Sequence, residues 1–166
     1  MSRNRQTYIF GLLIAMTALL LSACIAPIQP AAADSGEQMT DAPASSELTV
    51  EQLGNATYSG IYDESVALTD GLYEGEPFVE GGASRPTVQL IEDTVLYGDL
   101  NGDGVDDAAM LLVENSGGSG VFTYLGAQIN QDGQPVDAGT VLLGDRTQIQ
   151  SGVIEDGQIV IDMVTQ

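Results

Sequence analysis

Two apolar runs of the chain are separated by the polar stretch Asp99-Leu100-Asn101-Gly102-Asp103-Gly104-Val105-Asp106-Asp107. The run before it, residues 94–97, has the composition of a short β-strand. The run after it, residues 108–114, is apolar on both faces, as a fully buried strand is. The polar stretch is therefore predicted to be a loop that joins two strands of a sheet.

Oxygen atoms suited to a cation recur at alternate positions of this loop. Calcium takes about 6–8 oxygen ligands, and a tight loop supplies them from alternate side chains and one backbone carbonyl. Glycine stands where such a loop must turn sharply, at Gly104. The sequence therefore predicts a calcium site whose ligands are Asp99, Asn101, Asp103, the carbonyl of Val105, and Asp107.

The D-x-N-x-D-G-x-x-D spacing resembles the calcium loops of FG-GAP/VCBS-type β-propeller repeats and of dockerin-like modules. The resemblance covers residues 99–107 alone, so it implies a surface calcium loop and does not imply a propeller. Met110 stands where an EF-hand has its bidentate glutamate, which predicts a weak structural site with an affinity on the order of 10⁻⁴–10⁻³ M. The alternative is a plain hairpin turn at Asn101-Gly102 or Asp103-Gly104.

The chain is strongly acidic. Its 166 residues include 24 acidic and 4 basic side chains, for a formal charge of −20. Such a chain is repelled by nucleic acid, so its expected partners are cations, including a cationic protein or peptide. A generally solvated surface is the alternative, because the charge is spread along the sequence. The absence of histidine and lysine excludes histidine triads, imidazole zinc sites and lysine P-loops.

The first 23 residues have the pattern of an export signal. Arg3 and Arg5 precede an apolar run over residues 9–21, which is shorter than the roughly 20 residues that a membrane-spanning helix needs. Residues 1–23 are therefore predicted to be a cleaved leader.

Leu21-Ser22-Ala23-Cys24 resembles the bacterial lipobox. The resemblance implies that Cys24 becomes the lipidated N-terminus and that its acyl chains hold the protein in the membrane. An ordinary signal with an incidental cysteine is the alternative, although a lone thiol is unusual in an exported chain. Ile25 follows the cysteine, which by the same resemblance favours the outer membrane or cell surface.

The remainder divides into a tether and one domain. Residues 24–47 are rich in Pro, Ala, Ser and acids, which predicts a lipidated, disordered tether. Residues 48–166 are predicted to form a β-rich acidic domain. Thr49 and Gln52 have capping-box spacing, which predicts one short N-terminal helix.

From residue 65 onward, short strands and turns recur at hairpin intervals. The expected fold class is mainly β: an antiparallel sheet, small sandwich or open barrel. A first hairpin is predicted from residues 65–68 and 72–74, and the last strand, 158–164, would need a chain extension or a partner strand to protect its edge. The other strands are expected at 87–91, 94–97, 108–114, 121–129, 136–143 and 148–154, with turns at Asp132-Gly133, Gly144-Asp145 and Asp156-Gly157.

Carboxylates are the only side chains available for acid–base catalysis. Neighbouring acids such as Glu92-Asp93 and Asp106-Asp107 point to opposite faces of a strand, so they form no dyad by themselves. Arg85 and Arg146 are expected to pair with acids, and the tyrosines to lie in the core or at its rim.

The sequence thus predicts an exported, lipid-anchored envelope protein whose calcium-stabilised β-rich domain is a non-catalytic binding or structural module. One alternative is an acidic inhibitor or scavenger of a cationic envelope enzyme or peptide. A second is a carboxylate-dependent hydrolase, which would need two acids about 5–10 Å apart. No oligomeric state follows from the sequence.

Overall fold

The structure is a computed structural model that describes residues 2–8 and 47–165. Cys24 and the predicted tether up to residue 46 lie outside the described residues. Within the described ranges, no helix is both long and apolar enough to cross a membrane.

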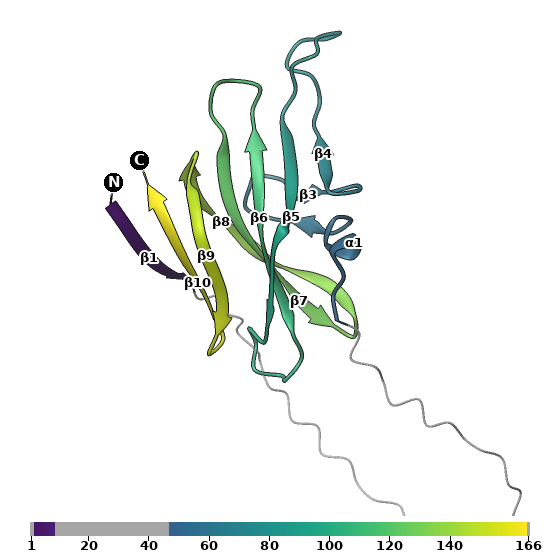
Figure 1. The fold of residues 1–166 in the computed structure, drawn as a ribbon. Coiled ribbons are helices and arrows are strands. Elements are labelled where there is room, and N and C mark those ends of the chain that lie inside the picture. Colours follow the sequence, from purple (N-terminus) through teal and green to yellow (C-terminus); the bar gives the residue numbers. More distant parts are fainter. Residues whose placement is uncertain (1, 9–46, 166) are drawn as a thin grey trace, which may run out of the picture. The chain divides into compact units, whose positions relative to one another are not determined.

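All paired strands are antiparallel, and the predicted mainly β fold class is confirmed. A curled five-stranded sheet has the order β4-β5-β6-β7-β8, and a three-stranded sheet has the order β1-β10-β9 (Figure 1). The five strands are β4 (Leu72–Glu74), β5 (Thr87–Gly98), β6 (Asp107–Asn115), β7 (Phe122–Gln131) and β8 (Gln134–Asp145). The others are β1 (Ser2–Tyr8), β9 (Gln148–Glu155), β10 (Gln158–Thr165) and the short pair β2 (Thr57–Tyr58) and β3 (Val66–Ala67).

Two of the predicted hairpin turns are formed. Both residues have positive φ at Asp132-Gly133 (53° and 79°) and at Asp156-Gly157 (52° and 70°), the type I′ geometry that suits the twist of the flanking strands. The third turn lies two residues later than predicted, at Arg146-Thr147, because Gly144 and Asp145 remain within β8 and Arg146 takes the left-handed conformation.

The first predicted hairpin is wrong. Asp70 and Gly71 do form a turn with positive φ, but only the single bridge Thr69↔Leu72 crosses it. β3 pairs instead with β2, and β4 pairs with β5 at the edge of the large sheet. These more distant partners offer each short strand a place over the hydrophobic core, which a local hairpin does not.

The two strands predicted at 87–91 and 94–97 form one bent strand, β5. Its register against β6 shifts between Ile91 and Leu96. Within the shift, the Thr94 hydroxyl donates to the Ile91 carbonyl at 2.6 Å and accepts from the Leu111 N–H at 3.1 Å. A side chain thus replaces the backbone partner that a bulge removes, which keeps the sheet continuous.

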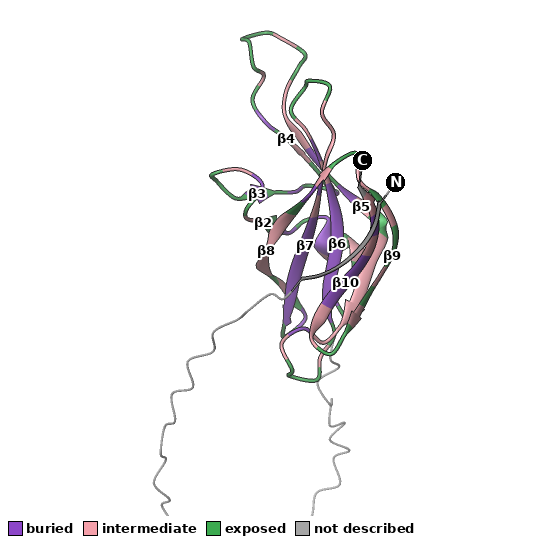
Figure 2. Cartoon of the chain, turned by 90° about the vertical axis from the view of Figure 1, so that its left-hand side faces the viewer, coloured by how far each residue is buried: buried purple, intermediate pink, exposed green. Residues whose placement is uncertain are grey.

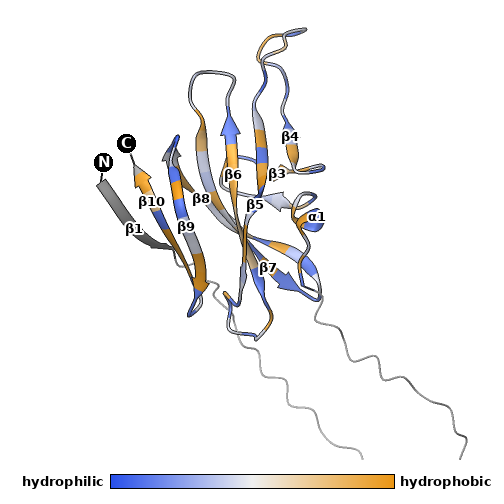
Figure 3. Ribbon diagram, in the orientation of Figure 1, coloured by the Kyte–Doolittle hydropathy of each residue, from blue (hydrophilic) through white to orange (hydrophobic). Residues whose placement is uncertain are grey.

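The large sheet is covered on both faces, and Figures 2 and 3 show β6 as a buried, apolar strand. One face packs against α1 (Val50–Leu53), β2 and β3, and the other packs against β9 and β10. The first core contains Leu53, Tyr58, Val66, Val88, Leu90, Met110 and Leu112. The second contains Ala109, Leu125, Ala127, Ile129, Ile159, Ile161 and Met163. The central position predicted for residues 108–114 is confirmed.

The helix α1 begins with the predicted capping box. The Thr49 hydroxyl accepts from the Gln52 N–H at 3.2 Å, and the Gln52 side chain accepts from the Thr49 N–H at 2.8 Å. The Gln52 amide also donates to the Gly133 carbonyl at 2.7 Å. The first described residues of the domain are thereby tied to the β7–β8 turn.

Strand β1 lies within the predicted leader. It pairs with β10 from Ser2↔Thr165 to Tyr8↔Ile159 and so covers the strand edge that the sequence analysis expected to need protection. Cleavage after residue 23 remains a prediction, and it would uncover that edge.

Candidate functional site

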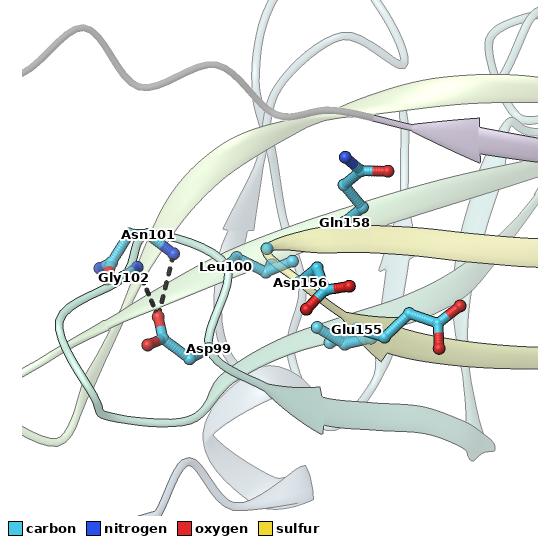
Figure 4. A pocket seen from close by; sticks show the side chains of 9 residues that line it. Asp99, Leu100, Asn101, Gly102, Glu155, Asp156 and Gln158 are labelled. Atoms are coloured by element: carbon cyan, nitrogen blue, oxygen red, sulfur yellow. Dashed lines mark hydrogen bonds between the residues drawn. The ribbon is translucent and has the colours of Figure 1, made fainter.

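The predicted metal loop joins β5 to β6 at the end of the large sheet where the β9–β10 turn also lies (Figure 1). A hollow of about 640 Å³ is lined by loop residues 99–102 and turn residues 154–158. Figure 4 shows Asp99 with its loop partners on one side of this hollow and Glu155 and Asp156 on the other.

Asp99 organises the first half of the loop. Its carboxylate accepts N–H bonds from Asn101 at 3.2 Å, from Gly102 at 2.6 Å and from Gly104 at 2.9 Å. The bonds from Gly102 and Gly104 lower the pKa of Asp99, because they stabilise the charged carboxylate. Both glycines have φ of 84°, a conformation that other residues seldom adopt, so the turns that present these N–H groups need glycine.

Asn101 and Asp103 continue the same pattern. The Asn101 side-chain oxygen accepts from the Asp103 N–H at 2.8 Å, and one Asp103 oxygen accepts from the Val105 N–H at 2.8 Å. The Asn101 amide donates to the other Asp103 oxygen at 2.9 Å. Local side-chain bonds to the backbone therefore set the loop's conformation, and the Asn101 and Asp103 side chains contact each other.

Asp107 lies beneath the loop and is fully buried. One carboxylate oxygen accepts from the Leu100 N–H at 2.8 Å, and the other accepts from the Asn130 N–H on β7 at 2.8 Å. Burial raises the pKa of Asp107 despite these two bonds, and the charges of Asp103 and Asp99 raise it further. Asp107 therefore joins the loop to two strands as well as standing at a predicted ligand position.

The donor set fits a calcium ion in its chemistry. Every predicted ligand atom is oxygen, and an oxygen that accepts one hydrogen bond, such as Asp99 Oδ2, keeps a second lone pair, whereas Asp99 Oδ1 already accepts two. The mutual repulsion of Asp99, Asp103 and Asp107 is the electrostatic situation that a cation relieves. Among the described residues, however, no three Asp, Glu, His or Cys side chains gather as a metal-binding group, so the amide and the carbonyl would be needed.

The two arginines of the domain lie at its surface. Arg85 is 4.0 Å from Glu74, and Arg146 is 3.3 Å from Asp145. Arg146 also donates to the Ser119 carbonyl, which links two loops. Of the neighbouring acid pairs, Glu92 and Asp93 are both exposed. Each of these two arginines thus lies beside an acid, as the sequence predicts.

A second buried carboxylate was not singled out by the sequence analysis. Glu114, near the end of β6, is 2% exposed, and its Oε1 accepts from the Tyr62 hydroxyl at 2.9 Å and from the Ser116 hydroxyl. The ring centroids of Tyr62 and Tyr73 are 6.3 Å apart. Burial, and then the hydrogen bond to Glu114, raise the pKa of Tyr62, and burial and the Glu114 charge raise that of Tyr124.

One sequence signal could have found this cluster. Ala108, Met110 and Leu112 alternate along β6 on the face of the first core, and Glu114 occupies the next position of that series. A charged residue at an apolar position of a central strand is unusual unless it has polar partners.

Comparison with known proteins gives no relative: no family model, curated protein or solved structure matches this chain.

Proposed function

We propose that this chain is an exported, lipid-anchored protein of the cell envelope whose calcium-stabilised β-rich domain is a non-catalytic binding or structural module. The single observation that carries the calcium assignment is the loop itself. Three side chains of the predicted set, Asp99, Asn101 and Asp103, are pre-arranged by their own backbone bonds. Asp107 and the Val105 carbonyl would complete the oxygen set.

The proposed ion has a structural role. It would reduce the repulsion among Asp99, Asp103 and Asp107, and it would join the β5–β6 loop more firmly to β7 through Asp107. The first described residues of the domain, 47–53, lie close to β7, because α1 is bonded to the β7–β8 turn at Gly133. Calcium would therefore stiffen the end of the domain that leads to the proposed lipid on Cys24.

Thermal unfolding of the full-length protein tests the metal assignment. Calcium at about ten times its dissociation constant should stabilise the folded state by about 1.4 kcal/mol, which raises the melting temperature by several degrees. The double variant Asp99→Ala, Asp103→Ala should lose this rise. The variant Asp63→Ala, Asp93→Ala removes the same charge from exposed sites and should keep it. An unchanged melting temperature at millimolar calcium would contradict the metal assignment and leave the loop as a plain hairpin turn.

Mass measurement of the exported protein tests the anchor. The proposal expects an N-terminus at Cys24 that carries diacylglycerol, and it expects a Cys24→Ser variant to lack the lipid. An unmodified Cys24 in the mature protein would contradict it.

A second candidate function is favoured by the Glu114 cluster. A buried carboxylate bordered by tyrosine rings suits an acidic inhibitor or scavenger of a cationic envelope enzyme or peptide.

A further inference from the structure

We propose that Glu114 and the rings of Tyr62, Tyr73 and Tyr124 receive a basic side chain, an arginine guanidinium or lysine ammonium, from a partner protein or peptide. The inference rests on the proposed binding role of the domain and names the chemistry of its partner. It is independent of the calcium loop, which lies at the other end of β6.

The first step is the charge balance around Glu114. The carboxylate is almost fully buried, and a buried charge is costly unless it is paired and hydrogen-bonded. The described residues contain four arginines and no lysine: Arg3 and Arg5 lie on β1, and Arg85 and Arg146 pair with the exposed acids Glu74 and Asp145. Among the described residues no ion pair to Glu114 is formed, so we assign the complementary positive charge to another molecule.

The second step is the nature of the groups that hold Glu114. Both donors are hydroxyls on rotatable side chains, Tyr62 and Ser116. A hydroxyl can donate to the carboxylate and still accept a hydrogen bond from an incoming cation. Such partners can adjust when a ligand arrives, whereas backbone N–H groups within a sheet cannot.

The third step is the placement of the aromatic rings. The register places Tyr73 opposite Val88 and Val88 opposite Glu114, so these residues form one row across β4, β5 and β6. Tyr124 lies opposite Leu112 on β7, next to this row. Tyr62 and Tyr73 are inclined at 49° to one another. The three tyrosines are only partly buried and pack against the edge of the first core, and aromatic rings beside a carboxylate attract a cation by their quadrupoles, in addition to the attraction of the carboxylate charge.

The fourth step is the surface around the cluster. Loops 75–86 and 116–121 project from the same end of the sheet (Figures 1 and 2). They contact each other, because a Cβ on Gly117 would meet the Ser84 hydroxyl and the Phe78 ring. Phe78 is 56% exposed and Val79 is 72% exposed, and acidic residues 76 and 80 flank them. An exposed apolar tip with acidic neighbours suits a partner segment that carries both basic and apolar residues.

The position of this end supports the same partner. The described domain starts at the opposite end, where α1 is tied to the β7–β8 turn. Glu114 thus lies at the other end of the described domain from residues 47–53.

Binding of a synthetic peptide to the full-length protein tests the proposal. The probe has one arginine flanked by leucines, and its matched control has citrulline, which keeps the shape of arginine without the charge. Affinity is measured at low ionic strength for the wild type, for Glu114→Gln and for Glu64→Gln, an exposed acid near Tyr62 that controls for net charge. Glu114→Gln should weaken binding of the arginine peptide at least tenfold, and Glu64→Gln less than twofold.

Further variants keep the result interpretable. Tyr73→Leu should also weaken binding, whereas Tyr73→Phe, which retains the ring face, should bind nearly as the wild type does. The melting temperature of each variant reports its folding, and Tyr73→Phe tests the site even if Tyr73→Leu unfolds. The Asp99→Ala, Asp103→Ala variant should bind the peptide normally, so failure of the calcium assignment and failure of this site are distinguishable.

Three outcomes would overturn the proposal. Equal weakening by Glu114→Gln and Glu64→Gln would assign the binding to the general acidic surface. Equal affinity for the arginine and citrulline peptides would remove the cation from the recognition. Affinity for free N-acetylarginine amide equal to that for the peptide would make the ligand a small cation, not a partner chain.

Discussion

The two ends of β6 hold two buried acids in different ways. Asp107 starts the strand, is 0% exposed and accepts both of its hydrogen bonds from backbone N–H groups. Glu114 lies near the other end, is 2% exposed and accepts from side-chain hydroxyls. Backbone N–H groups are fixed by the fold, so Asp107 has a structural role: it holds the β5–β6 loop and β7 together. Hydroxyl donors can exchange partners, so Glu114 is suited to a ligand. Two equally buried carboxylates are thus held by different kinds of donor.

The largest expected effect is at Asp107. The change Asp107→Ala leaves the N–H groups of Leu100 and Asn130 without their charged acceptor inside the domain. We expect it to lower the free energy of unfolding by about 3 kcal/mol, as measured by urea denaturation. The neighbouring exposed acid is the control: Asp106→Ala should change it by less than about 0.5 kcal/mol. Equal losses of unfolding free energy in the two variants would mean that Asp107 does not hold the loop and β7 together.

Removing the N-cap of α1, at the same end of the domain, is expected to lower the free energy of unfolding less than Asp107→Ala does. Thr49→Ala removes the acceptor of the Gln52 N–H at the start of the helix. The expected loss is about 1 kcal/mol, and Thr49→Ser should retain most of the stability because serine also caps. If both variants have the same free energy of unfolding as the wild type, the packing of Leu48 and Leu53, and not the cap, holds the start of the domain in place.

Glu114→Gln is expected to change stability less than either of these variants. The amide oxygen can still accept from Tyr62 and Ser116, so the free energy of unfolding should change by less than about 1 kcal/mol. The same denaturation measurement checks it. A loss as large as that of Asp107→Ala would remove the distinction between the two ends.

The smallest expected effect is in the pH dependence of stability. The folded-state pKa of Asp99 lies below its ordinary value of 3.8, so its contribution is present above that value and is lost as the pH falls through the folded pKa. The raised pKa of Asp107 acts in the opposite direction: its contribution is present below 3.8 and is lost as the pH rises through the folded pKa.

Unfolding free energies measured from pH 5 down to pH 2.5 check these signs. We expect the free energy of unfolding to fall less steeply with decreasing pH in Asp99→Asn than in the wild type, because the variant lacks the carboxyl group whose pKa is lowered by backbone bonds. The exposed Asp93→Asn variant provides the charge-matched control. An unchanged slope in Asp99→Asn would show that its backbone bonds do not persist in solution.

Much of the fold follows from local chemistry. The Asp-Gly pairs at 132–133 and 156–157 form the predicted turns because their residues tolerate positive φ. The capping box at Thr49 and the buried strand β6 are likewise encoded by neighbouring residues. The same is true of Asp99, Asn101 and Asp103, whose bonds are made to N–H groups within five positions of each.

The remaining features depend on residues that are distant in the sequence. The failed hairpin at 65–74 shows this for the strands, since β3 and β4 took partners that no local pattern identifies. Asp107 could be recognised as an acid in a loop, but its bond to Asn130 requires the register of β6 against β7. Glu114 meets Tyr62 across 52 positions of sequence.

The sequence by itself determined the antiparallel β class, the turns at 132–133 and 156–157, the helix cap and the local geometry of the Asp99 loop, because these depend on the φ preferences and short-range hydrogen bonds of a few residues. Only the tertiary structure decided which strands pair, which acids are buried and that Glu114 lies among tyrosines. Those properties arise when the two faces of one curled sheet are covered by distant segments, and burial then changes the chemistry of whichever side chain lies beneath them.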